Sequence, residues 1–267
     1  MRPPDASCYP ISARLRPFDH LTDVQPTRTH TPDLTRCAAC GAPLWGGYYT
    51  FDDRPERYCP RCIAGARRCD ACAAPLGREH WRLHDGRALC PRCHATAVYD
   101  VAEAQRLYEE TVAAVTVQLG LRLQAGVVFR LVDAPALEQA RREGGAIDAE
   151  QKTLGLYQRN GAVRMIYALY GLPRLTFRTV VAHEYAHAWQ AERCPSLDDL
   201  ALCEGFAEWV AYRHLLFLGC TAAARRMRAA MHPYRPLLEQ MLALEADGGP
   251  AAVIRHMLTA SGAPAHP

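Results

Sequence analysis

The sequence predicts an α+β fold in which a small cysteine-rich module precedes a larger mixed domain. Three observations carry this prediction. Eight cysteines recur in four C-x-x-C pairs between residues 36 and 94. After residue 95, apolar residues recur first at helical and then at strand spacing. A segment without Gly or Pro, residues 177–192, then carries two histidines four positions apart, which places them on one face of a helix.

The length and composition set the limits of the fold. The 267-residue chain is 49% hydrophobic, which allows one large domain or two unequal ones. It contains no apolar run near 18 residues, and no apolar segment typical of a secretory signal follows Met1. We therefore expect a cytoplasmic protein without a membrane partner.

The charge of the chain is mildly basic, with a formal net value of +3. Of its 31 basic residues only Lys152 is a lysine, which we interpret as codon bias in a GC-rich bacterial source. Residues 1–95 carry 14 arginines against 10 acidic residues. This excess is too small to indicate a nucleic-acid-binding protein.

The N-terminal third of the chain divides into a tail and a repeat. Residues 1–35 contain six prolines and no periodic pattern, so we expect a disordered or loosely attached tail. Residues 36–94 hold two similar copies, with opening C-x-x-C pairs 32 residues apart and closing pairs 31 residues apart. The cysteines of the two copies are Cys37, Cys40, Cys59 and Cys62, then Cys69, Cys72, Cys90 and Cys93.

Each copy of the repeat predicts a zinc ribbon, two cysteine knuckles joined by a short hairpin around one structural zinc ion. Cytosolic cysteines at this spacing indicate metal ligands and not disulfides. Because each site already has four thiolates, we expect His80, His84 and His94 to be loop residues. A closed four-cysteine site has no open position for chemistry, so its role is structural, with a protein partner as the alternative.

The larger domain, residues 95–267, alternates helices and strands. The expected helices are residues 95–119, 136–143, 177–192, 196–219 and 221–261, the last with a break at 232–236, and the expected strands are residues 126–133, 153–157 and 162–170. Asn160-Gly161 signals a hairpin turn between the last two strands. Thr176 and Ser196 are the expected helix N-caps.

The segment His183-Glu184-Tyr-Ala-His187 indicates a catalytic zinc site. Both histidines can direct a ring nitrogen at one zinc ion, and Glu184 can take a proton from water. A third ligand is expected on the next helix. Glu204 is favoured because Gly205 beside it permits close packing, and Glu208 would then hold the second nitrogen of His183. The exchange of these two roles is the alternative.

Two stretches make a family resemblance specific. YGLPRLTFRTVVAHEYAHAW, residues 170–189, and CEGFAE, residues 203–208, resemble the plant LIM-domain, ubiquitin-activated peptidases that limit organ growth. The resemblance implies a zincin-like, gluzincin-type fold, with His183, His187 and Glu204 as zinc ligands and Glu184 as general base. Six residues separate Cys62 from Cys69 here, so the cysteine module is LIM-related and not a standard LIM domain.

The predicted function is a zinc-dependent endopeptidase of protein or peptide substrates, with one catalytic and two structural zinc ions. The strand at residues 162–170 is expected to be the sheet edge on which an extended substrate lies. A non-catalytic zinc-ribbon adaptor is the alternative. Resemblance to other gluzincins suggests a Tyr or His oxyanion donor after Glu204, and Tyr234 is chosen over Tyr212, His214 and His232.

Overall fold

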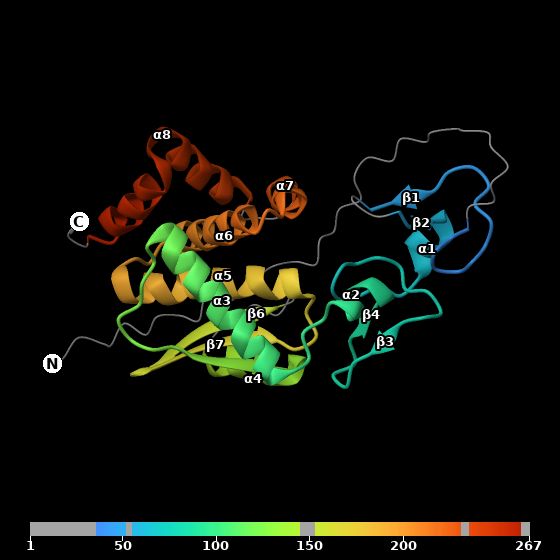
Figure 1. Cartoon of the computed structure of the whole chain (residues 1–267), viewed down its shortest axis with the longest axis horizontal. Coiled ribbons are helices and arrows are strands. Elements are labelled where there is room, and N and C mark those ends of the chain that lie inside the picture. The colour runs from blue at the N-terminus through green and yellow to red at the C-terminus, as the bar shows by residue number, and fades with distance from the viewer. Residues whose placement is uncertain (1–35, 52–54, 145–152, 231–234, 263–267) are drawn as a thin grey trace. The chain divides into compact units, whose positions relative to one another are not determined.

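The computed structural model describes residues 36–51, 55–144, 153–230 and 235–262 (Figure 1). The described residues form two compact units. One contains the cysteine repeat up to Ala97 together with Gly171–Pro173, and the other contains Val98–Tyr170 and the chain from Arg174 onward. The tail expected at residues 1–35 and the candidate oxyanion donor Tyr234 lie outside the described residues.

The two copies of the cysteine repeat fold alike, each as a short antiparallel hairpin followed by one short helix. The elements are β1 (Tyr49–Thr50), β2 (Arg57–Tyr58) and α1 (Pro60–Gly65) in the first copy, and β3 (Trp81–Arg82), β4 (Ala88–Leu89) and α2 (Pro91–Ala95) in the second. Both helices have Pro at their start, where its fixed φ suits a helix and its missing N–H leaves no bond unmade.

The repeat extends to single contacts and backbone angles. Arg36 Nη1 donates to the Gly41 carbonyl at 3.0 Å, and Arg68 Nη1 donates to the Ala73 carbonyl at 3.1 Å. Gly41 has φ +74° and Ala73 has φ +58°, so both copies make the same left-handed turn after their first C-x-x-C pair. Only the first copy uses glycine, the residue that adopts this conformation without steric cost.

The larger unit is built on a three-stranded sheet with the order β5-β7-β6. Its strands are β5 (Val128–Val132), β6 (Gly155–Asn160) and β7 (Val163–Leu169). Strand β7 pairs in parallel with β5 and antiparallel with β6, across the expected turn at Gly161. The expectation that residues 162–170 form the sheet edge is therefore wrong. Among the described strands β5 and β6 each pair only with β7, so these two strands lie at the edges of the sheet.

Helices cover both faces of this sheet. The helices of the larger unit are α3 (Val101–Leu119), α4 (Ala134–Glu143), α5 (Arg174–Arg193), α6 (Leu200–Phe217), α7 (Thr221–Ala229) and α8 (Arg235–Ala260). Of these, α3, α4 and α5 pack on the sheet. On the β6 edge strand, a Cβ on Gly155 would point at α5, whereas Gln158 donates to the Ala140 carbonyl of α4. Odd and even strand positions thus face different helices, as the period-2 geometry of a strand requires.

The caps of the helices show where local signals were misread. Helix α5 begins at Arg174, so the expected cap Thr176 lies inside the helix. Helix α6 is capped by Asp199 and not by Ser196, because the Asp199 carboxylate accepts from the Leu202 N–H at 3.0 Å. Ser and Asp are both common N-cap residues, and the negative charge of an Asp also interacts favourably with the positive end of the helix dipole.

The core of the larger unit lies between the sheet, α5 and α6. Helix α5 packs on β6, β7, α3 and α6, and α6 packs in turn on α8. Trp189 of α5 stacks on Phe206 of α6 with ring centroids 5.3 Å apart, and Phe206 lies 5.7 Å from Trp209. None of the helices in the described part of the chain is long and apolar enough to cross a membrane.

Candidate metal centre

Helix α5 places its two histidines side by side in the core. Val180, Val181 and Ala182 precede them and are fully buried, so this stretch of α5 is enclosed on every side. His183 and His187 are themselves 0% exposed, and their Nε2 atoms lie 3.0 Å apart. Burial lowers the pKa of His183 to about 3 and that of His187 to about 4. Both rings are therefore neutral at neutral pH, the form that binds metal ions.

Helix α6 brings Glu204 to the same point. Its Oε2 lies 3.6 Å from His183 Nε2, and its Oε1 lies 3.9 Å from His187 Nε2. The ligand atoms of these three residues all lie within 4.8 Å of one another. Glu208, one helical turn further on, lies on the other side of His183, with Oε1 3.8 Å from Nδ1. Glu204 thus faces both Nε2 atoms, and Glu208 faces the outer nitrogen of one ring.

These distances fit a zinc ion. Nitrogen and oxygen ligands at about 2.0–2.1 Å from a tetrahedral ion lie about 3.3 Å apart, close to the separations among His183, His187 and Glu204. Burial, followed by the charge of Glu204, raises the pKa of Glu208 to about 8. A cation in the site would act against that rise. The residues present therefore suit a divalent metal better than they suit an empty buried pair of carboxylates.

Glu184, on α5, faces the edge strand β6. It is fully buried. A Cβ built on Gly155 of β6 would lie 3.0 Å from Glu184 Cγ and Oε1. The start of the edge strand thus passes directly over the candidate base, a proximity that only a residue without a side chain permits.

Gly205 was expected to allow close packing against the metal site, and this expectation is wrong because Gly205 faces α8. A Cβ on Gly205 would lie 2.8 Å from Leu237 Cβ and 3.2 Å from the Leu237 carbonyl oxygen, both on α8. Gly205 therefore allows α6 to approach α8, and it does not open space toward the histidines. The convergence of Glu204 on α5 comes from the aromatic packing of α5 on α6 instead.

One residue of the site has no counterpart in the sequence expectations. Gln190 lies one turn after His187, with Oε1 2.8 Å from His187 Nδ1 and Nε2 2.9 Å from the Cys203 carbonyl. It is 2% exposed. Its spacing of three residues from His187 on a helix was the available signal. Its second partner, on α6, could only come from the fold.

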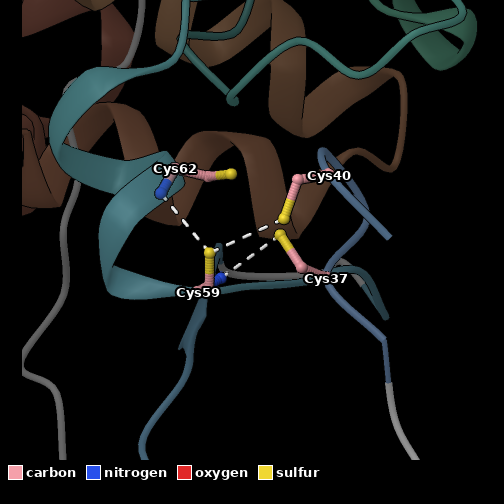
Figure 2. A group of neighbouring side chains, drawn as sticks. All are labelled: Cys37, Cys40, Cys59 and Cys62. Atoms are coloured by element: carbon pink, nitrogen blue, oxygen red, sulfur yellow. Dashed lines mark hydrogen bonds between the residues drawn. The ribbon is translucent and has the colours of Figure 1, made fainter. Parts of the chain in front are cut away.

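Each copy of the cysteine repeat gathers its own four sulfurs. In each copy the four Sγ atoms lie within 4.8 Å of one another. Figure 2 shows the first cluster, with Cys37, Cys40, Cys59 and Cys62 directed toward a common centre. The Cys40–Cys59 sulfurs are 3.9 Å apart, and the Cys72–Cys90 sulfurs are 3.7 Å apart. Thiolates bound at about 2.3 Å to a tetrahedral zinc ion lie about 3.8 Å apart, so both clusters fit zinc.

Backbone N–H groups assist the thiolates. The Cys59 N–H points at Cys37 Sγ, 3.4 Å from N to S, and the Cys90 N–H makes the equivalent contact to Cys69 Sγ at 3.3 Å. Burial raises the pKa of the Cys37 thiol, but hydrogen bonds from the backbone of Cys59, Cys40 and Ala39 outweigh burial and lower that pKa to about 6. All three of the histidines expected in loops lie outside the clusters, and His80 and His84 lie in loops as expected. The expectation is wrong for His94, which lies in helix α2 and stacks on Trp81 with centroids 4.2 Å apart.

The remaining oxyanion candidates are placed as follows. Tyr212, on α6, lies beside Arg228 of α7, whose guanidinium pairs with Glu239 at 2.7 Å. His214 is 1% exposed, and burial, followed by the charge of Arg178, lowers its pKa to about 4. His214 does not belong to the group formed by the two histidines and Glu204. His232 lies outside the described residues, as Tyr234 does.

Comparison with known proteins points to one family. The DA1-like family, described as "Protein DA1", matches residues 101–231. Protein DA1 of Arabidopsis thaliana is 28% identical over 170 residues, which cover 50% of this chain and 32% of the relative. LIM domain-containing protein HDR3 of Oryza sativa subsp. japonica is 27% identical over 179 residues, covering 55% of this chain and 34% of the relative.

A third relative extends the same pattern. Protein DA1-related 6 of Arabidopsis thaliana is 30% identical over 179 residues, covering 52% of this chain and 28% of the relative. The chain thus spans about a third of the length of these curated relatives. No solved structure matches it.

The DA1-like match covers the helices that carry both histidines and Glu204. The findings therefore support the DA1-like family at modest identity. LIM-type and zinc-binding features are supported by the HDR3 relative and by the two cysteine clusters.

Proposed function

We propose that the chain is a zinc-dependent endopeptidase of protein substrates. The observation that carries the proposal is the convergence of His183, His187 and Glu204 from two helices, with Glu184 directly after His183 on α5. Three protein ligands leave one tetrahedral position for water or substrate, which distinguishes such a centre from the closed four-cysteine clusters. The DA1-like match over the same helices adds to this support.

The chain's own residues have distinct tasks in this reaction. A zinc ion bound there would polarise a peptide carbonyl and lower the pKa of water. Glu184 accepts the proton of the attacking water and passes it to the amine that leaves. Glu208, whose Oε1 lies 3.8 Å from Nδ1 of His183, would orient that ring once the two atoms close to hydrogen-bond distance. The burial of all these groups strengthens each electrostatic contact, because little water screens it.

The edge strand β6 is the proposed place for the substrate. An extended peptide can add to a sheet edge through main-chain hydrogen bonds. Strand β7 cannot serve, because β5 and β6 occupy both of its sides. Gly155 brings the start of β6 against Glu184, so a peptide along this edge would pass close to the candidate base.

The cysteine module is proposed to bind protein and not nucleic acid. Within the described residues 36–97, nine arginines face four acidic residues, an excess of five. A zinc ion with four thiolates carries a net charge of about −2, so two such sites nearly cancel this excess. Trp45, at 80% exposed, and Trp81, at 40%, offer aromatic surface of the kind that protein interfaces use.

The test combines metal analysis with substrate profiling. The proposal predicts three zinc ions per chain, and two in a His183→Ala/His187→Ala double variant. Glu184→Gln should retain zinc but lower kcat by about 10²–10⁴-fold, the contribution of a positioned general base. Cleaved protein ends should accumulate with the wild type and not with Glu184→Gln.

Glu109→Gln, at an exposed carboxylate of α3, is the matched control and should behave as wild type. A wild-type count of two, unchanged in the double variant, would refute the proposed function.

A further inference from the structure

Gln190 connects the two helices that supply the candidate zinc ligands. Its carbonyl oxygen contacts His187 Nδ1 at 2.8 Å on α5, and its amide nitrogen donates to the Cys203 carbonyl at 2.9 Å on α6. Cys203 directly precedes Glu204 in the sequence. One side chain therefore holds a ligand of α5 and the backbone next to a ligand of α6.

The orientation of the Gln190 amide follows from its partners. The Cys203 carbonyl can only accept a hydrogen bond, so the NH₂ end of the amide must face it. The carbonyl end then faces His187, and a carbonyl oxygen can only accept. The proton of the neutral imidazole must accordingly be on Nδ1.

This tautomer is the one that a metal site needs. With the proton on Nδ1, the lone pair of His187 is on Nε2, which faces His183 and Glu204. The other tautomer would direct an N–H into the site and leave two acceptors facing each other at 2.8 Å. Gln190 is buried, so no solvent competes for either of its bonds.

We propose that Gln190 is a positioning residue of the metal centre: it fixes the tautomer of His187 and the spacing between α5 and α6 at Glu204. The inference rests on the metal centre of the proposed function. It assigns His187 a partner of a different kind from that of His183, whose Nδ1 faces the Glu208 carboxylate at 3.8 Å. A neutral amide beside one ring and a carboxylate beside the other limit the negative charge stored around the site.

The experiment measures zinc affinity, which does not depend on peptidase activity. Zinc is withdrawn by chelators of graded strength from wild type, Gln190→Leu and Gln190→Glu, and each released equivalent is counted. Gln190→Leu should weaken zinc binding at the His183, His187 and Glu204 site by about 10–100-fold, the usual effect of losing an outer partner of a metal-binding His. The two four-cysteine sites should keep their affinities and serve as internal references.

The two variants separate the two bonds of Gln190. Gln190→Glu keeps an acceptor for His187 Nδ1 but loses the donor to the Cys203 carbonyl. It should therefore recover part of the affinity that Gln190→Leu loses. Nitrogen NMR of the His187 ring should show a protonated Nδ1 in wild type and a mixture of tautomers in Gln190→Leu.

A matched control removes another buried hydrogen bond of the same unit. Thr111 is fully buried on α3, and its hydroxyl donates to the Leu107 carbonyl at 2.7 Å. Thr111→Val should lose stability in denaturant without a change in zinc affinity. Unchanged affinity in Gln190→Leu, or an equal loss in Thr111→Val, would overturn the inference.

The outcomes distinguish this inference from the peptidase proposal. If the third site weakens as expected while no substrate is cleaved, the positioning role stands and the peptidase proposal fails. If wild type holds only two zinc ions, both fail together.

Discussion

Replacing Gly155 by Ala tests how closely β6 must approach the candidate base. A Cβ at this position would lie 2.4 Å from Val180 Cγ1 and 3.0 Å from Glu184 Cγ. Carbon atoms pack at about 3.5–4.0 Å, so the overlap with Val180 exceeds about 1 Å. Val180 cannot turn away easily, because a valine in a helix has one strongly preferred rotamer. The strand or the helix must therefore move.

The expected cost follows from two opposing effects. Inserting a methyl group into a packed core destabilises by about 1–3 kcal/mol. Replacing Gly by Ala in an ordinary strand conformation stabilises the folded state by about 0.5–1 kcal/mol, because it lowers the conformational entropy of the unfolded chain. We expect Gly155→Ala to lower the free energy of unfolding by about 1–2 kcal/mol. A shift of Glu184 by about 1 Å would also lower kcat by about 10²-fold.

The assay is denaturant unfolding together with kcat and zinc content. Gly126→Ala is the matched control, because nothing lies within 4 Å of a Cβ at that position. The double variant Gly155→Ala/Val180→Ala should be more stable than the sum of the two single losses predicts. The reason is that Val180→Ala removes the Cγ1 atom that the new Cβ would overlap. Gly155→Ala with wild-type stability and wild-type kcat would refute the packing argument.

Three further predictions concern the first cysteine cluster, the packing of α6 on α8 and the ion pair of Glu192. Cys37→Ser should reduce the zinc count by one while the Cys69 cluster keeps its metal; loss of both would show that the copies share ligands. Gly205→Ala should destabilise by about 1–3 kcal/mol, because its Cβ would meet Leu237 at 2.8 Å, and it should leave the zinc count at its wild-type value.

The third concerns Glu192, which pairs with Arg164 and accepts the Gln124 N–H at 2.7 Å. Burial raises its pKa, but the Gln124 bond and Arg164 outweigh burial, so the pKa is lowered. This contribution is complete above the unfolded value of about 4.3 and is lost as the pH falls through the lowered pKa. Glu192→Gln should thus cost about 1–3 kcal/mol at pH 7 and less in acid, as measured by pH-dependent unfolding. A cost that does not vary with pH would contradict the assignment.

The sequence predicted what depends on local spacing. The two histidines of α5 are four residues apart, so any regular helix brings them together. The two cysteines of each C-x-x-C pair are likewise brought together by a local turn, and the repeat indicates which two pairs share one site. The strands and most helices were placed within a few residues of their observed bounds, since apolar period and Gly or Pro signals are also local.

What the sequence did not predict depends on contacts between distant segments. The order of the strands places β7 in the centre because β5 joins it from the other side, about 35 residues earlier in the chain. Gly205 faces α8 because of how α6 and α8 cross, which no motif encodes. Gln190 was missed because its second partner, Cys203, is 13 residues away on another helix.

The left-handed turn at Ala73 has a consequence for how far each copy would depend on a bound ion. An alanine at φ +58° costs about 1–2 kcal/mol that Gly41 avoids at the matching position. Such a conformation persists only where its surroundings impose it, and here hydrogen bonds from Arg68 and between the Cys69 and Ala74 backbone hold the turn beside Cys72. A bound ion would therefore contribute more to the backbone path of the second copy than to that of the first, where glycine meets no such cost. Under zinc starvation the duplicated halves would become unequal, and the second would be the first to lose its shape.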